Sequence, residues 1–202
     1  SSEYVEMVRF MINNDLSVQS NYEYIESLMD MGSYIDWVIQ EIYVANPSWR
    51  HNHEWWRDKT NNGKWQWMNV DMDRGFDRAN VKSNLLDDFI ENSYSGAKHG
   101  DPIFKNLIKN EYFKNYFIHR YVTHVNTTYN PDRIIRVIDS LQNNIRGAMP
   151  DHIARWSSDN RIKSIDDWNN NVEELREFAR DRPEYAYSQI AKEFYVSGTV
   201  NL

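Results

Sequence analysis

Two aspartates separated by one residue are the first candidates for chemistry in this sequence. Asp71 and Asp73 lie near the end of the segment GKWQWMNVDMDRGF, residues 63–76, directly after an alternating aromatic pattern. If that pattern continues as a β-strand, its period of two sends both carboxylates to the same side. Oxygen ligands of this kind suit Mg²⁺ that bridges phosphates. Acids at strand ends are also common as solvated turn residues or helix caps, so both interpretations stand at this point.

A β-hairpin is the element that would position the two acids. Between residues 54 and 73 the hydrophobic period changes to two, and Trp65 and Trp67 fall on one strand face. The dipeptide Asn62–Gly63 is typical of a type I′ turn, because both residues accept positive φ angles. We therefore predict a hairpin over about residues 54–73 that ends in the two aspartates.

Helical periodicity dominates the rest of the chain. Apolar positions recur at helical spacing in three early segments and again in the second half of the sequence, with helix-capping patterns at Asn130–Pro131 and at Ser164 followed by Asp167. The predicted helices cover about residues 5–12, 24–29, 35–42, 134–145, 165–178 and 185–194. The sequence thus predicts a mainly α fold with one β-hairpin, in a single domain over residues 1–202.

The composition excludes several classes of partner. A hydrophobic fraction of 41% in 202 residues is enough for one substantial core. The formal net charge of -7 disfavours nucleic acid and anionic membrane surfaces, because both require a basic patch. The sequence has no apolar run of the roughly 20 residues that a membrane span requires, no secretion signal at its start and no cysteine. We expect no nucleic-acid partner and no membrane span.

Two other kinds of catalytic site are not expected. Of the six histidines, only His51 and His53 are close in sequence, and neither an H-E-x-x-H motif nor a cysteine accompanies them, so a zinc site is not predicted. Ser48 lacks the G-x-S-x-G motif of a nucleophile elbow, which argues against a serine hydrolase. The acids near the hairpin remain the leading candidates.

The wider context of these acids resembles the CotH kinase family, the spore coat protein H-like atypical kinases. The resemblance rests on YIDWVIQEIYVANPSWRHNHEWWRDKTNNGKWQWMNVDMDRGF, residues 34–76, in which an asparagine-containing loop follows a helix and leads through a hairpin to a W-x-x-x-D-x-D-x-G-F segment. Farther along, AMPDHIARW, DDWNNNVEELREFARDRP and SGTVNL resemble the closing helices and the terminal strand-like segment of that family. The resemblance covers about residues 4–202 and implies a fold similar to the helical C-terminal lobe of protein kinases.

The resemblance also implies roles for individual residues. Asp73 is similar to the kinase aspartate that precedes a glycine and holds Mg²⁺ on the phosphates of ATP. Asp71 is the alternative metal ligand or an acid that orients the site, and it is counted with Ser48 among the candidate catalytic positions. Asn52 matches the loop asparagine that resembles the second metal ligand, with a simple loop cap as the alternative.

Ser48 departs from the family pattern. Two residues after the asparagine equivalent to Asn46, the family is expected to carry an aspartate that accepts the proton of the substrate hydroxyl. Serine has no basic oxygen at neutral pH, so this role is missing or has moved if the alignment is right. An alignment slip of one residue in NPSWRHNHEWW, residues 46–56, is the competing explanation.

The resemblance leads to two functional hypotheses. The first is the C-terminal lobe of a kinase that transfers phosphate from Mg-ATP to Ser or Thr of a secreted or spore-coat protein of a bacterium. No Gly-rich phosphate loop occurs in the sequence, so the β-rich N-terminal lobe is expected to lie outside this chain, which we expect to be inactive alone. The second is a non-catalytic structural or binding module, whose tryptophans Trp49, Trp55 and Trp56 are expected to be exposed and to stack on sugars.

Overall fold

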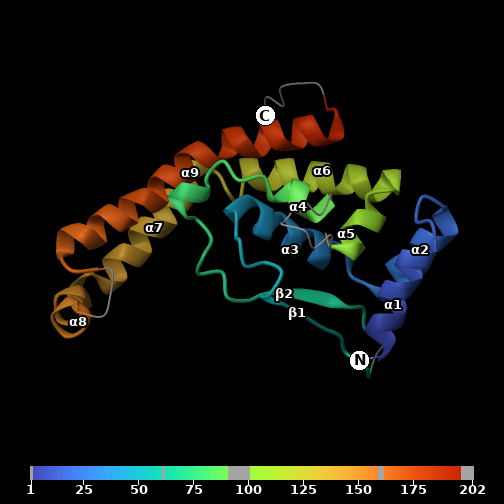
Figure 1. Cartoon of the computed structure of the whole chain (residues 1–202), viewed down its shortest axis with the longest axis horizontal. Coiled ribbons are helices and arrows are strands. Elements are labelled where there is room, and N and C mark those ends of the chain that lie inside the picture. Colours follow the sequence, from blue (N-terminus) through green and yellow to red (C-terminus); the bar gives the residue numbers. More distant parts are fainter. Residues whose placement is uncertain (1, 61, 91–100, 159–161, 197–202) are drawn as a thin grey trace.

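Helix α3, Met31–Val44, runs through the centre of the computed structural model, which describes residues 2–60, 62–90, 101–158 and 162–196 (Figure 1). The Asp30 carboxylate caps its start by accepting a hydrogen bond from the Ser33 amide at 3.0 Å. Most of its side chains are buried, including Ile35, Val38 and Ile42. The apolar residues predicted a helix only over 35–42, and the capping residue accounts for the longer start.

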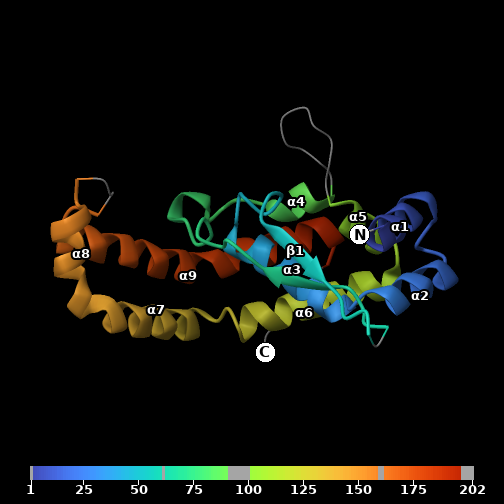
Figure 2. The same cartoon turned by 90° about the horizontal axis from the view of Figure 1, so that it is seen from below.

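The other elements surround α3 or extend away from it, and the mainly α fold with one hairpin is confirmed. Figure 2 shows that α7, α8 and the first half of α9 form an arm that projects from a body made by the remaining elements. The elements are α1 (Ser2–Asn13), α2 (Gln19–Leu28), β1 (His53–Trp56), β2 (Gln66–Asn69), η1 (Arg78–Asn80), α4 (Leu85–Ile90), α5 (Pro102–Leu107), α6 (Glu111–Asn126), α7 (Pro131–Ile145), η2 (Arg146–Ala148), α8 (Met149–Trp156) and α9 (Ile165–Phe194).

Strands β1 and β2 form the predicted hairpin, but its turn differs from the prediction. The strands pair antiparallel with Trp55 opposite Trp67, and the side chains of Trp65 and Trp67 are both buried. Residues 57–65 connect the strands, so Asn62–Gly63 is not a two-residue type I′ turn. Asn62 has a φ of 50°, whereas Gly63 lies outside the left-handed region. Glycine is required there because a Cβ atom would lie 2.6 Å from a backbone oxygen of the loop.

The predicted helix caps at Asn130 and Ser164 are confirmed. The two helices predicted over residues 165–178 and 185–194 form one continuous helix, α9. The Asn130 side chain accepts from the amides of residues 132 and 133, and the Ser164 hydroxyl accepts from the Asp167 amide at 3.0 Å. Helix α9 continues through Pro183, which a sequence pattern treats as a break. The segment SGTVNL, residues 197–202, lies outside the described residues.

A small apolar cluster around Trp168 and several polar contacts together hold the arm. Between α7 and α9, Arg176 pairs with Asp139 at 2.6 Å and Gln142 donates to Asn169 at 3.0 Å. Some apolar side chains on α7, among them Leu141, are exposed. Within the described residues, no helix combines the length and the apolar character that crossing a membrane would need.

A buried arginine joins α9 to the end of α3. The Arg182 side chain is fully buried, and its guanidinium donates to the carbonyl oxygens of Ile42 and Tyr43, both at 2.8 Å. It also donates to the carbonyls of Val81 at 2.7 Å and Ser83 at 3.0 Å. The last carbonyls of a helix lack partners within the helix, so Arg182 satisfies the C-terminal end of α3 and fixes the segment after η1 against it.

Arg182→Met is expected to destabilise the fold by about 3 kcal/mol or more, because it keeps the length of the side chain but leaves the carbonyls of Tyr43 and Val81 without the donor that they have here. The free energy of unfolding from urea titrations gives the measurement. Arg180→Met is the matched control on the same helix, since Arg180 is exposed and, among the described residues, pairs only with Glu173. Its expected loss is below about 1 kcal/mol. Equal losses in the two variants would contradict the role of Arg182.

Candidate functional site

The candidate site begins where α3 ends. Ala45 has a left-handed φ of 54°, which stops the helix, and Asn46 follows as a buried residue. The Asn46 amide nitrogen donates to the Glu41 carboxylate at 2.9 Å, and its side-chain oxygen accepts from the Ser48 backbone amide at 3.1 Å. The first residues of the loop are therefore tied to the last turn of the helix.

A tight turn brings Ser48 and Asn52 close together. The Ser48 carbonyl accepts from the backbone amides of His51 at 2.9 Å and Asn52 at 3.2 Å. Asn52 stands at the start of β1, and its side-chain amide donates to the Asp71 carboxylate at 2.7 Å. Three of the four residues predicted from the sequence thus gather at one place, although Asn52 and Asp71 are 19 residues apart.

The segment that carries Asp71 and Asp73 is a loop and not the end of a strand. Strand β2 ends at Asn69, and Asp71 adopts a left-handed φ of 52°. Strand alternation therefore does not set the directions of the two carboxylates, and that part of the prediction is wrong. Asp73 is exposed and has no hydrogen bond or ion pair within the described part of the chain.

Close packing against α3 fixes the far end of this loop. The Phe76 amide donates to the Val44 carbonyl at 2.9 Å, and the Gly75 amide donates to the Met72 carbonyl at 3.0 Å. A Cβ atom on Gly75 would lie 2.8 Å from a methyl group of Val44, closer than ordinary contacts allow. Phe76 has a φ of 59°, and its ring packs 4.9 Å from that of Phe178 in α9. The D-x-D-x-G-F segment is thus anchored at its glycine and phenylalanine.

Glu41 is a site residue that the sequence interpretation did not select. It is fully buried on α3, and burial raises the pKa of its carboxyl to about 7, an effect that the hydrogen bond from Asn46 partly offsets. The Asn46 amide also lies 3.8 Å from the sulfur of Met72, between the two aspartates. The sequence feature that could have identified Glu41 is an acid inside an apolar helix, five residues before an asparagine.

The oxygen donors of the site fit a metal ion that is held mainly by phosphates. Among the described residues, no group of three or more His, Cys, Asp or Glu side chains could hold a metal ion. Asp71 and Asp73 supply two carboxylates, and Asn52 supplies an amide oxygen beside the nitrogen that contacts Asp71. Mg²⁺ in proteins is commonly bound by one or two carboxylates while phosphates and water complete its shell. The donors therefore suit Mg²⁺ on a nucleotide better than a metal ion bound by protein alone.

The tryptophans near the site do not form the exposed stacking surface that was expected. Trp49 is buried and stacks on Phe89 with ring centroids 3.9 Å apart. Trp55 is half-buried and stacks on Tyr4, whereas Trp56 is 46% exposed. Because neighbours in a strand point to opposite faces, Trp55 and Trp56 cannot bind one sugar ring together.

Comparison with protein-family models matches residues 1–186 to the model described as CotH kinase protein. The match contains the whole segment from Glu41 to Phe76 and the buried Arg182. No curated protein and no solved structure matches the chain.

Glu41 is expected to make stability depend on pH. Between about pH 4.5 and 7 the folded state keeps a proton that the unfolded state has lost, so stability falls as the pH rises through this window and then levels off. The expected contribution is about 3 kcal/mol across the window. Glu41→Gln should remove this slope from denaturation curves measured at each pH, while Glu184→Gln, at an exposed position on α9, should keep it. A slope that persists in Glu41→Gln would contradict the assignment.

Gly75→Ala is expected to destabilise the chain by about 1–3 kcal/mol, because the new methyl group overpacks against the side chain of Val44. Thermal unfolding followed by circular dichroism gives the measurement. Gly147→Ala is the control, since a Cβ atom there has nothing within 4 Å and should cause no loss. If Gly75→Ala were as stable as the control, the close approach to α3 would not hold the loop.

Proposed function

Because the chain belongs to the CotH kinase family, we propose that it is the C-terminal lobe of an atypical protein kinase that transfers phosphate from Mg-ATP to Ser or Thr of a secreted or spore-coat protein. The single observation that carries the proposal is the 2.7 Å hydrogen bond between Asn52 and Asp71. It joins the two segments that a kinase needs at its metal ions, the catalytic loop and the D-x-D loop.

The proposed roles follow from the positions of the oxygen donors. Asp73 is free of competing partners among the described residues, so its carboxylate is available to a metal ion on the nucleotide. Asp71 is already hydrogen bonded to Asn52, which suits an acid that orients the asparagine and adds a second carboxylate. When bound, Mg²⁺ would neutralise the negative charge of the phosphates during transfer.

The outer face of the hairpin is the proposed surface for the nucleotide base or for the lobe that covers it. Glu54 and Trp56 alternate onto this face, and Met68 of β2 lies opposite Glu54. Trp56 is 46% exposed and Met68 is 39% exposed, so two apolar side chains lie on the strands that begin after Asn52 and end before Asp71. A flat aromatic base would cover such a surface well.

Ser48 sits where a kinase is expected to carry its proton acceptor. Its backbone amide and carbonyl are both used in the turn that positions Asn52, and its side chain is half-buried. Phosphoryl transfer depends mostly on positioning and on neutralising charge, so a serine here is compatible with slow transfer. The same serine favours the second candidate function, a coat or cell-surface module that has the fold without the catalysis.

The metal assignment can be tested on the 202-residue chain with Mn²⁺ in place of Mg²⁺. At millimolar ATP, paramagnetic Mn²⁺ is expected to broaden the backbone amide NMR signals of Asn52 and of residues 71–73. Asp73→Asn should abolish this broadening. Asp77→Asn, which keeps the cap of η1, should preserve it. Broadening that survives both Asp71→Asn and Asp73→Asn would overturn the assignment.

The catalytic assignment needs a chain joined to the covering β-rich lobe that the family resemblance implies. The chain alone is expected to bind Mg-ATP more weakly than micromolar and to transfer no phosphate, measured by calorimetry and by a radiolabelled phosphate assay. In the joined protein, Ser48→Asp is expected to raise the transfer rate by about a hundredfold, the usual contribution of a general base. If the joined protein binds Mg-ATP and neither form transfers phosphate, the non-catalytic function is favoured.

A further inference from the structure

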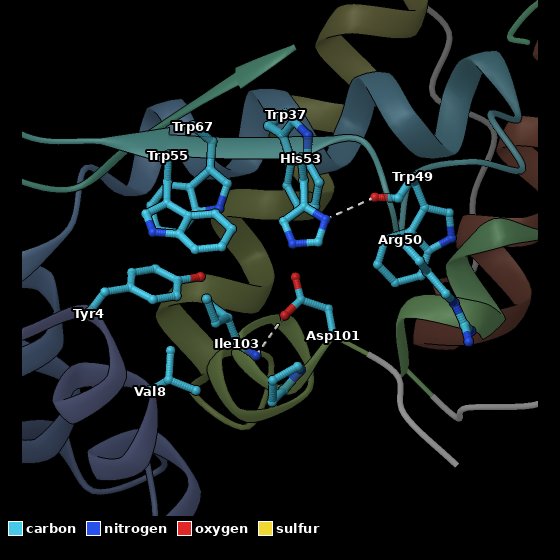
Figure 3. A pocket seen from close by; sticks show the side chains of 11 residues that line it. Tyr4, Val8, Trp37, Trp49, Arg50, His53, Trp55, Trp67, Asp101 and Ile103 are labelled. Carbon is cyan, nitrogen blue, oxygen red and sulfur yellow. Dashed lines mark hydrogen bonds between the residues drawn. The ribbon is translucent and has the colours of Figure 1, made fainter. Parts of the chain in front are cut away.

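A cavity of about 450 Å³ lies on the inner face of the hairpin, away from the proposed nucleotide surface (Figure 3). His53 and Trp55 of β1 alternate onto this face, whereas Glu54 and Trp56 point to the other. The remaining walls come from α1, α3, β2 and the start of α5. The volume is in the range of small-molecule sites, and no role in the proposed phosphate transfer uses it.

Aromatic side chains make most of the wall. Four tryptophans line the cavity, Trp37, Trp49, Trp55 and Trp67. The Trp55 ring stacks on Tyr4, at a centroid distance of 4.2 Å, and on His53, at 5.3 Å. The faces of aromatic rings carry partial negative charge and attract cations.

His53 presents a hydrogen-bond acceptor to the cavity. Its Nδ1 atom lies 3.2 Å from the backbone carbonyl of Trp49, and a carbonyl can only accept, so Nδ1 carries the hydrogen. The other ring nitrogen, Nε2, is then an acceptor in the neutral ring. Figure 3 shows this nitrogen turned toward the Asp101 carboxylate.

Asp101 adds a buried carboxylate to the same space. It is 9% exposed, accepts from the Tyr34 hydroxyl at 2.7 Å and from the Ile103 amide at 2.8 Å, and burial raises its pKa. None of the ion pairs in the described part of the chain includes it. Asp101 caps the start of α5, but an asparagine would cap this helix equally well. Capping therefore does not explain why the residue is an acid. A buried carboxylate that has hydrogen bonds but no ion pair is costly, and a cation in the cavity would compensate its charge.

We propose that this cavity binds a small organic amine in its protonated form. The ammonium group donates hydrogen bonds to the Asp101 carboxylate and to Nε2 of His53, and the apolar body of the ligand packs among the tryptophans. The Arg50 guanidinium, the nearest fixed cation on the cavity wall, is directed away from this space in Figure 3 and lies 5.1 Å from the centre of the Trp49 ring. Two acceptors within aromatic walls select a donor that carries positive charge.

Calorimetry on the 202-residue chain tests the proposal with three probes of similar size. Benzylammonium is expected to bind about tenfold or more tightly than neutral benzyl alcohol, and methyl glucoside is expected to show no binding. On benzylammonium binding, the indole N–H NMR signals of Trp55 and Trp67 should shift while that of Trp156, on α8, should not. Equal affinity for benzyl alcohol, or binding of the glucoside alone, would overturn the proposal.

Two variants separate charge from shape. Asp101→Asn keeps the helix cap and is expected to lower benzylammonium affinity about tenfold, whereas Asp151→Asn, the same change at an exposed position on α8, should leave it unchanged. Val8→Trp leaves Asp101 intact and fills the cavity from α1, so it should abolish binding even if Asp101→Asn proves too unstable to measure. Unchanged affinity in Val8→Trp would place the amine elsewhere and overturn the proposal. These results do not depend on ATP, so they are independent of the proposed kinase function.

Discussion

The geometry of the candidate site depends on one buried guanidinium. Arg182 donates to two carbonyls at the end of α3 and to two carbonyls in the segment after η1, and these two places flank the loops that carry Asn52 and Asp71. Removing a charge from water is unfavourable, and burial accordingly lowers the pKa of Arg182. Four carbonyl acceptors and the negative end of the α3 dipole compensate this cost. The helix that extends into the arm therefore also holds the end of α3, where the candidate site begins, in place.

The hairpin separates two chemical environments by strand alternation alone. Its outer face carries the exposed side chains of Trp56 and Met68, and its inner face lines an aromatic cavity that also contains Asp101. Trp55 and Trp56 are neighbours in the sequence but belong to different environments. A kinase-like role and an amine-binding role can therefore occupy the same two strands without sharing a side chain.

Local patterns predicted the fold well, whereas contacts between distant segments were not predictable. The change of period at the hairpin and the caps at Asn130 and Ser164 depend on residues within one or two turns, and the structure contains them. The direction of Asp71 depends on a left-handed residue after a strand that ends early, and alternation could not reveal it. Two helices were predicted over residues 165–178 and 185–194 because local patterns describe isolated segments, but α9 is continuous and packs against both α7 and α6.

The sequence separation of these contacts has a consequence for the order of folding. The bonds that shape the loop, from Glu41 to Phe76, close within 36 residues of chain, whereas Arg182 meets Tyr43 across 139 and Ile42 across 140. Closing a long loop costs more chain entropy, so distant pairings are generally made after local ones. We therefore expect α3 and the hairpin to assemble early and the loop ends to become fixed only when α9 docks. During synthesis, the site can acquire its final shape only after Arg182 has left the ribosome.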